Sequence, residues 1–254
     1  LVLLRINTKP LRNEKRNIYN RTVGDTMKLN NSTVEVLKNF ATINSNIVIG
    51  TEGFVRSVAI AKNVMAKANI TDAFPYKFGV YDLPEFLSCY SLFDDAELTF
   101  SDTQKFVTFS DGIQSIKYFF SDVENLVTSD KDITMPESAL TFTITDSQLA
   151  SIRKASGALK ANDMVITKNT EGGLWTKLTV TDRDNPTSNE FSINIANCSI
   201  DTEENFEFVF NINNFKFNQA DEYKFEVASK MISKVTTDNV DYWLALEKSS
   251  KIGV

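Results

Sequence analysis

Short stretches rich in Val, Ile, Phe and Thr recur along the chain from Met27 onward, and turn residues separate them. Runs of this length and composition are typical of β-strands in antiparallel meanders. The pattern therefore predicts a protein built mainly of antiparallel sheet. In the first half of the chain, the predicted strands are 47–49, 54–60, 63–70, 76–81, 96–101, 105–110 and 114–120.

Three segments, 32–43, 84–93 and 147–159, show instead the 3.6-residue period of amphipathic helices. We expect their apolar halves to pack on the sheets, where burial is favourable by about 25 cal/mol per Å² of apolar surface. Asn31 or Ser32 is expected to cap the first helix. The sequence thus predicts an α+β protein with inner helices, each of which keeps one polar face.

The polar face of the third segment is basic. Asp146 is expected to cap this helix, and the outward residues that follow include three cations and no acid, namely Arg153, Lys154 and Lys160. Two interpretations stay open. The face is either an ordinary solvated helix surface or a surface that attracts a phosphate backbone without reading bases. The outward residues of the first segment are Glu35, Lys38, Asn39 and Thr42.

The context of the first helix occurs twice along the chain. Segment 27–49 runs strand, cap, helix, tight turn and strand, and so does 140–168. Ile152-Arg153 then aligns with Leu37-Lys38, an offset of 115 residues (152 − 37). A long repeat of this kind indicates two similar domains that arose by duplication.

A second pair of segments supports the repeat. Segment 77–100 resembles 207–229, where the helix is shortened to about 213–217. The predicted domains are 27–120 and 139–254, and the polar, acidic segment 121–138 between them is expected to be a connector.

Composition narrows the chemistry. The 254-residue chain has a formal net charge of −6 and no histidine. It therefore lacks the commonest general base and the usual partner of a Ser or Cys nucleophile, which lowers the expectation of an enzyme. Two distant cysteines, Cys89 and Cys198, indicate a reducing compartment. No run approaches the roughly 18 apolar residues of a membrane span.

The first 26 residues differ from the rest in charge, because they contain six Lys or Arg and only two acids, which gives a net charge of +4. Residues 27–254 therefore carry −10 (−6 − 4). We expect an extension that is disordered or results from upstream read-through. The alternative is a basic arm that contacts nucleic acid.

Other candidate sites are weaker. The acidic loops 93–97, 129–132 and 182–185 lack the spaced ligands and glycine of a calcium loop, so solvated turns are favoured and no metal is expected. No phosphate-binding glycine motif occurs, and 171–173 is expected to be a hairpin turn. A predicted strand carries a Phe at every second position, namely Phe206, Phe208 and Phe210. We expect these side chains to belong to the hydrophobic core and not to form a surface on which bases stack.

A family resemblance is carried by LKNFATINSNIVI (37–49) and AKANITDAFPYKFGVYDLPEFLSCYSLFDDAEL (66–98). These runs resemble the sliding clamps of T-even-type bacteriophages, which are processivity factors of the phage DNA polymerase. The likeness continues in register through NINNFKF and VDYWLALE (240–247) and covers essentially all of 27–254. It implies a homotrimeric ring of two-domain subunits, similar in shape to proliferating cell nuclear antigen, with helices lining the pore.

The resemblance also implies partners. Such a ring would surround duplex DNA without sequence preference, hold the replicative DNA polymerase, and require an ATP-dependent clamp loader but no cofactor. It would act in the cytoplasm of the infected bacterium and could also serve late transcription. By position, the DNA-facing residues would be Lys38, Asn39, Thr42, Arg153, Lys154, Lys160 and Lys216.

The same resemblance places partner tails beside the connector, at Leu126, Val127 and Ile133. Ring closure would pair the edge strands 113–120 and 190–196 of neighbouring subunits. Two other functions stay open. The chain could be an oligomeric structural β-protein of a virion without a DNA-encircling role, or it could be a carboxylate-based hydrolase.

Overall fold

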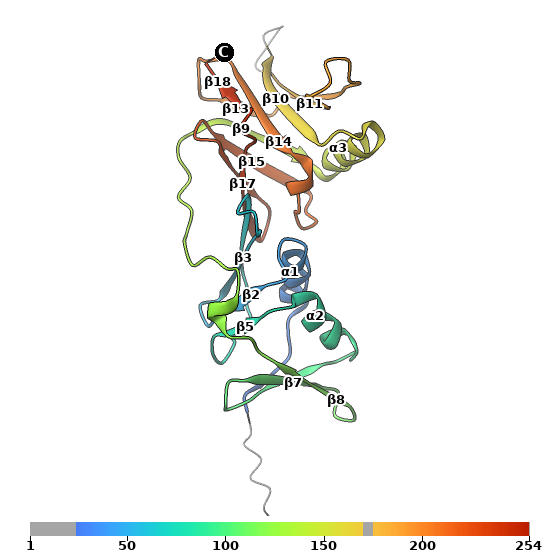
Figure 1. Ribbon diagram of the computed structural model, residues 1–254, viewed down its shortest axis with the longest axis vertical. Helices are drawn as coiled ribbons and strands as arrows, with labels where there is room; N and C mark the ends of the chain where they lie inside the picture. The colour runs from blue at the N-terminus through green and yellow to red at the C-terminus, as the bar shows by residue number, and fades with distance from the viewer. Residues whose placement is uncertain (1–23, 170–174, 254) are drawn as a thin grey trace, which may run out of the picture.

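The computed structural model describes residues 24–169 and 175–253. The molecule is elongated, and its two halves lie one above the other along the long axis (Figure 1). Helices α1 (Asn31–Ala41) and α2 (Leu83–Ser91) belong to the first half, and α3 (Asp146–Leu159) to the second. Most of the predicted extension, and the predicted turn at 171–173, lie outside the described residues.

Strands make up most of both halves. The strands of the first half are β1 (Thr26–Met27), β2 (Ile47–Ile49), β3 (Phe54–Val58), β4 (Val64–Asn69), β5 (Phe78–Val80), β6 (Glu97–Phe100), β7 (Phe106–Ser110) and β8 (Ser115–Phe119). The strands of the second half are β9 (Ser138–Thr145), β10 (Asp163–Asn169), β11 (Trp175–Thr181), β12 (Phe191–Ile195), β13 (Cys198–Ile200), β14 (Phe206–Asn211), β15 (Glu222–Ala228), β16 (Ile232–Thr236), β17 (Val240–Ala245) and β18 (Lys251–Ile252).

The two halves repeat one topology. In the first half, β1, β6, β7 and β8 follow one another in a sheet, and β9, β15, β16 and β17 do the same in the second. The set β5-β2-β3-β4 likewise has its counterpart in β14-β10-β11-β12. The internal repeat expected from the sequence is therefore visible in the strand order.

Strand pairing joins the two halves. β17 pairs antiparallel with β4, from Val240 opposite Ala68 to Leu244 opposite Val64. This junction produces a nine-stranded sheet that runs through both halves. The strands equivalent to β17 and β4 in the other half, β8 and β12, are edges of their sheets.

The first helix forms as its apolar pattern predicts, with Val34, Val36, Leu37 and Phe40 buried against the sheets. The predicted cap at Asn31 or Ser32 is wrong, because the N-cap is Asn30 and its side chain does not cap the helix. Its amide instead donates to Thr71 and Asp72 across the loop that follows β4.

The third helix begins one residue earlier than the sequence suggests. Thr145 is its N-cap and forms a capping box with Gln148, so the predicted cap Asp146 is wrong. Asp146 is the first helical residue, and its carboxylate accepts from the Tyr223 hydroxyl at 3.4 Å. A Thr with Gln three residues later satisfies two backbone donors reciprocally, which explains why Thr145 takes the position.

The shortened helix expected at 213–217 is a single 3₁₀ turn, η2 (Ile212–Asn214). Phe215 and Phe217 follow it, both buried, with ring centroids 5.2 Å apart. A second 3₁₀ turn, η1 (Val123–Asn125), opens the connector. Phe206, Phe208 and Phe210 are buried, so their prediction as core is confirmed.

The helices and the connector lie on opposite sides of the sheets. In Figure 1 the three α-helices are on the right and the chain between β8 and β9 runs along the left. The predicted class, two similar domains of antiparallel sheet with inner helices, is confirmed. All seven strands predicted in the first half are present, with ends that agree to within two residues.

Candidate nucleic-acid interface

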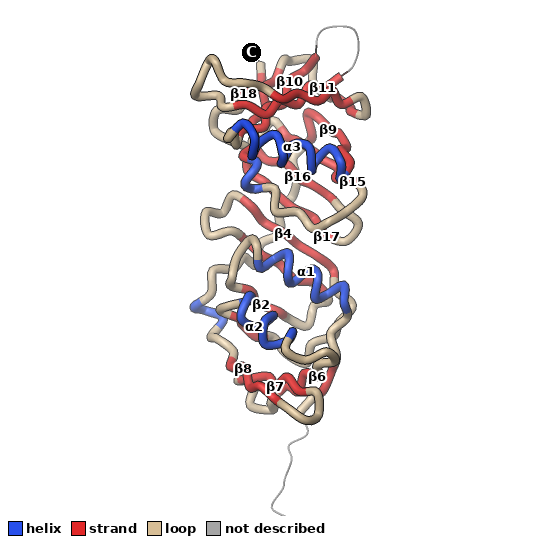
Figure 2. The backbone as a smooth tube through the Cα atoms, turned by 90° about the vertical axis from the view of Figure 1, so that its right-hand side faces the viewer, coloured by secondary structure: helices blue, strands red, loops and turns tan. Residues whose placement is uncertain are grey.

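The outward faces of α1, α2 and α3, with the neighbouring loop 212–219, form one continuous side of the molecule, which we call the helical surface. It faces the viewer in Figure 2, with the sheets behind it. The fold places the helices there because α1 and α3 follow equivalent strands, β1 and β9, and bury equivalent apolar residues, Leu37 and Ile152.

α3 supplies exposed cations to this surface. Arg153, Lys154 and Lys160 are all exposed. Lys160 is the C-cap of α3, in the left-handed conformation with φ 54°. Within residues 24–169 and 175–253, neither Lys154 nor Lys160 forms a salt bridge. Their charges therefore remain free to attract an anion.

Arg153 has a second role. Its Nη2 donates to the main-chain oxygen of Phe215 at 2.7 Å, which ties the loop 212–219 to α3. Part of the guanidinium is thus already engaged within the protein, although the side chain is exposed.

On α1, the Nζ of Lys38 lies 2.9 Å from a carboxylate oxygen of Glu35, three residues earlier. Both side chains are more than half exposed. Helix pairs of this kind are worth about 0.2–0.5 kcal/mol. Because this energy is small, Lys38 can exchange Glu35 for another anion at little cost.

Three of the predicted DNA-facing residues take part in contacts between the halves. Asn39 Nδ2 donates to the main-chain oxygen of Lys216 at 3.0 Å, and Lys216 Nζ donates to the main-chain oxygen of Thr42. The buried Tyr242 hydroxyl donates to Asn39 Oδ1 and accepts from Asn218 N, both at 2.8 Å. We call Asn39, Thr42, Lys216, Asn218 and Tyr242 the interdomain network.

The interdomain network holds α1 of the first half against the loop 212–219 of the second. Burial raises the pKa of Tyr242 far above its usual range, so the hydroxyl keeps its proton at every physiological pH. Buried, fully satisfied polar groups of this kind fix one arrangement of the elements that carry them.

The charge of the helical surface is uneven. α1 carries Glu35 and Lys38, and α2 contributes Glu85 and no cation. The second half contributes Arg153, Lys154, Lys160 and Lys216 against one acid, Asp146 in the first turn of α3. The cations of this surface are thus concentrated on α3 and the loop 212–219, in a chain whose net charge is −6.

The connector residues predicted to bind partners take three different positions. Leu126 is buried, and a Cβ on Gly79 would lie 2.7 Å from its Cδ1, so this side chain anchors the connector. Val127 is 40% exposed, while its main chain bonds to the buried amides of Asn44 and Asn46. Ile133 lines a groove of about 590 Å³ together with Trp243.

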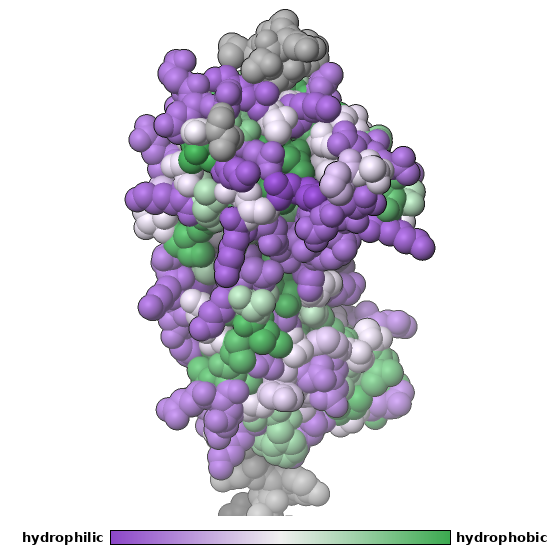
Figure 3. Space-filling view, turned by 45° about the horizontal axis from the view of Figure 1, so that its top comes forward, coloured by the Kyte–Doolittle hydropathy of each residue, from purple (hydrophilic) through white to green (hydrophobic). Residues whose placement is uncertain are grey.

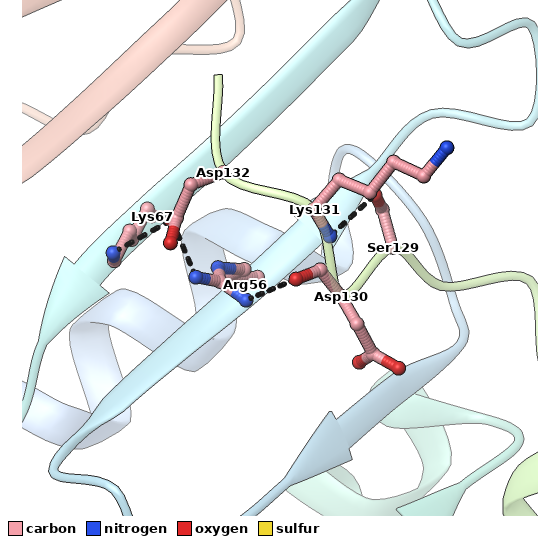
Figure 4. Close-up of polar contacts among 6 residues, drawn as sticks. All are labelled: Arg56, Lys67, Ser129, Asp130, Lys131 and Asp132. Carbon is pink, nitrogen blue, oxygen red and sulfur yellow. Dashed lines mark hydrogen bonds and ion pairs between the residues drawn. The ribbon is translucent and has the colours of Figure 1, made fainter. Parts of the chain in front are cut away.

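A further contact holds the middle of the connector (Figure 4). Arg56 on β3 donates to the main-chain oxygen of Asp130 at 3.1 Å and to the carboxylate of Asp132. Lys67 on β4 donates to the same carboxylate oxygen at 2.9 Å. We call Arg56, Lys67 and Asp132 the connector anchor. The hydrogen bonds from Lys67 and Arg56 lower the pKa of Asp132.

Sequence reasoning missed the connector anchor. It treated 129–132 as a solvated acidic turn and did not consider Arg56 or Lys67. A signal did exist, because both cations fall in the adjacent predicted strands 54–60 and 63–70, where facing like charges are unfavourable without a counter-charge.

No group of three or more acidic or cysteine side chains in the described part of the chain is placed to hold a metal ion. None of the helices in that part combines the length and the apolar character required to cross a bilayer. Hydrophilic residues cover most of the face in Figure 3, where hydrophobic residues form separate patches.

Two family models match the chain. The model described as DNA polymerase processivity factor matches residues 28–121, and the model described as gp45 sliding clamp, C terminal, matches 141–248.

Curated relatives are similar over most of the chain. The sliding clamp of Vibrio phage KVP40 is 33% identical over 225 residues, which are 87% of this chain and 99% of that protein. The sliding clamp of Escherichia phage RB69 is 28% identical over 228 residues, 88% of this chain and 98% of that protein. The sliding clamp of Enterobacteria phage T4 has the same identity and coverage.

Solved structures share the fold at low identity. Proliferating cellular nuclear antigen from Entamoeba histolytica has a TM-score of 0.61 at 14% identity, over 85% of this chain and 94% of that chain. The PCNA2–PCNA3 complex from Sulfolobus tokodaii has a TM-score of 0.61 at 14% identity, over 88% of this chain and 99% of that chain. At this identity the likeness concerns the fold alone.

Proposed function

Because the chain belongs to the family of bacteriophage sliding clamps, the DNA polymerase processivity factors, we propose that it forms a closed homotrimeric ring around duplex DNA and tethers the replicative polymerase. Clamps of this family are not enzymes, so the expectation of a non-enzymatic protein is confirmed. In this proposal each subunit has two domains, 27–120 and 139–254, and the connector 121–138 joins them.

One observation carries the proposal: two of the sheet edges, β8 and β12, are the equivalents of the two strands that pair at the junction. β17 pairs with β4 inside the chain, while β8 and β12 are left at the edges. A second copy can repeat the junction by placing its β12 beside β8. Head-to-tail contacts of this kind close into a ring when the rotation between copies permits it.

The edge β8 has the surface expected for such a contact. Phe119 at its end is 66% exposed, and Ile113 in the turn before it is 92% exposed. Along each strand, partly buried apolar residues alternate with exposed ones: Ile116 on β8, and Phe191 and Ile193 on β12. Pairing the two strands would join the apolar face of one sheet to that of the other. It would also satisfy the unpaired backbone groups of each edge.

In this ring the helical surface faces the DNA. Lys38, Arg153, Lys154, Lys160 and Lys216 would lie near phosphates, with Asn39 and Thr42 beside them. Attraction to phosphates is independent of sequence and weak for each cation. A protein that moves along DNA requires contacts of this kind.

The remaining parts of the proposal concern partners. An ATP-dependent loader opens the ring, and polymerase tails dock on the connector side at the exposed Val127 and at Ile133, while the buried Leu126 holds the segment that carries them. The clamp acts in the cytoplasm of the infected bacterium, and it can hold transcription proteins by the same surface.

A trapping experiment tests the encirclement directly. The clamp is mixed with a linear duplex that carries biotin at both ends, and streptavidin is added either before or after the protein. A ring threads only onto open ends, so the protein should stay bound through a high-salt wash only when streptavidin is added last. A structural protein of the virion, or a clamp that binds sideways, would give the same result in both orders, and that outcome would refute the proposal.

A further inference from the structure

The connector anchor joins a rigid pair of cations to a carboxylate on an irregular segment. Arg56 and Lys67 stand opposite each other on the paired strands β3 and β4. Both lie over the ring of Phe54, at 4.6 and 4.7 Å from its centroid. Like charges directly opposite each other on neighbouring strands repel. Asp241 lies opposite Lys67 on β17, but its carboxylate pairs with Lys234 at 3.1 Å, so Arg56 and Lys67 still require an anion.

Asp132 supplies the anion, but it is held loosely. The side chain of Arg56 is only 15% exposed and that of Lys67 28%, whereas that of Asp132 is 65% exposed. The cations come from a sheet, and Asp132 comes from a segment without regular structure between η1 and β9. Ion pairs with so exposed a partner are weak. The cations are therefore fixed, and the carboxylate can be replaced.

Two buried donors beside the anchor lack an acceptor within the described residues, and these are Arg56 Nε and Trp243 Nε1. Trp243 lines the groove of about 590 Å³ that also contains Lys67 and Asp132. Arg56 borders a smaller cavity of about 60 Å³ with Lys77 on its other side. The unmet hydrogen-bonding capacity on this face consists of donors and so matches a carboxylate-bearing ligand, although both atoms are enclosed while Asp132 is in place.

We propose that Arg56 and Lys67 form a carboxylate-binding site for an acidic peptide segment of a partner protein, and that Asp132 fills this site as an internal competitor in the free chain. The inference rests on the proposed function, because it names the chemistry of the segment that is tethered. When the partner's carboxylate displaces Asp132, the connector between Asp130 and β9 is released from the sheet.

A nucleic acid fits this site poorly, although it is also an anion. Asp130, Asp238 and Asp241 line the hollows on either side of the cations. These carboxylates repel the successive phosphates of a backbone, whereas a single peptide carboxylate can meet Arg56 and Lys67 alone. The groove walls formed by Ile133 and Trp243 favour apolar residues next to the acidic one.

Peptide binding tests the proposal. A rhodamine-labelled 12-residue peptide with the central sequence Gln-Leu-Glu-Leu-Gln, whose single Glu is its only acid, is titrated with the protein, and its fluorescence anisotropy is measured at low salt. A control peptide has Gln in place of this Glu, and a labelled single-stranded oligonucleotide serves as a second anion. The acidic peptide should bind at least about tenfold more tightly than either control, because the first control carries no negative charge to pair with Arg56 and Lys67 and the flanking acids repel the second.

Two sets of variants should act in opposite directions. Asp132→Asn removes the competitor and should tighten binding about three- to tenfold, as expected when a weakly closed state is opened. Arg56→Gln or Lys67→Gln removes part of the site and should weaken binding at least about tenfold. Asp130→Asn is the matched control, because it removes the same charge from the same loop, while Asp130 touches Arg56 only through its main chain.

Several results would overturn the inference. Equal effects of Asp132→Asn and Asp130→Asn on peptide binding would mean that the change in net charge, and not removal of a competitor, sets the affinity. Weaker peptide binding by Asp132→Asn would mean that Asp132 helps to bind the peptide. Equal binding of the Glu and Gln peptides would exclude carboxylate recognition. The trapping experiment uses no peptide and this titration uses no duplex DNA, so failure of the ring and failure of the site are distinguishable.

Discussion

Replacing Phe119 by Glu should separate the subunits of the ring. Phe119 is 66% exposed at the end of the edge strand β8. A Phe side chain buries about 200 Å² when it is covered completely, so a neighbouring copy would cover about 130 Å² here. At about 25 cal/mol per Å², this area is worth about 3 kcal/mol per interface. The dissociation constant of each interface should therefore rise roughly 100-fold.

Light scattering coupled to size-exclusion chromatography measures this effect over a dilution series. The parent chain should keep its oligomeric mass at concentrations where Phe119→Glu elutes as a monomer. Ile60→Glu is the matched control, because Ile60 is 74% exposed and lies in the turn between β3 and β4, outside the edge strands β8 and β12.

Thermal unfolding shows whether the variant keeps its fold. Within one copy, the Phe119 ring lies 5.7 Å from that of Phe106 between ring centroids, and the substitution removes this pair. Such an aromatic pair contributes about 0.5–1.5 kcal/mol, a modest fraction of the stability of a domain. A folded Phe119→Glu variant with the same mass as the parent at every dilution would refute the edge-strand interface.

Three further predictions concern other parts of the molecule. Lys154→Gln should lower the slope of log binding constant against log salt for duplex DNA by about 0.9 for each phosphate that this lysine neutralises, whereas Lys131→Gln on the connector should leave it unchanged. Tyr242→Phe removes the donor to Asn39 Oδ1 and should cost about 1–3 kcal/mol of unfolding free energy, measured by denaturant titration. Burial raises the pKa of Asp163 above its ordinary 3.8, so the folded chain binds this proton more tightly than the unfolded chain and stability falls as pH rises through the folded pKa. Asp163→Asn should therefore raise Tm at neutral pH and lose this advantage well below pH 3.8.

The local elements could be predicted from the sequence because their signals are local. Alternation and turn residues located β3 and β4 to within two residues of the predicted 54–60 and 63–70. The repeat located α3 and the strands around it. Helix starts were predicted less well, since the capping position depends on which side-chain oxygen reaches the first free N–H, as Thr145 does in place of Asp146.

The contacts between distant segments could not be predicted in the same way. Asn39 and Lys216 are 177 residues apart in the chain, and Arg56 and Asp132 are 76 apart. No period or spacing relates such pairs. Periodicity identified Asn39 as an outward residue of its helix, but it could not show that the loop 212–219 would lie against it. The pairing of β17 with β4 is non-local in the same sense, although the repeat then explains why β8 and β12 remain free.

The polar contacts that hold the helices in place bear on movement along DNA in the proposed ring. A sliding protein requires a rigid surface whose individual contacts are weak, since any one strong contact would hold it at a fixed position. Arg153 is the outward residue of α3 best able to grip a phosphate with two parallel hydrogen bonds. Part of its guanidinium is occupied by the Phe215 carbonyl. Lys154 and Lys160 remain as long, flexible point charges. The arrangement therefore uses its rigid polar groups to fix the helices and its flexible cations to attract the DNA.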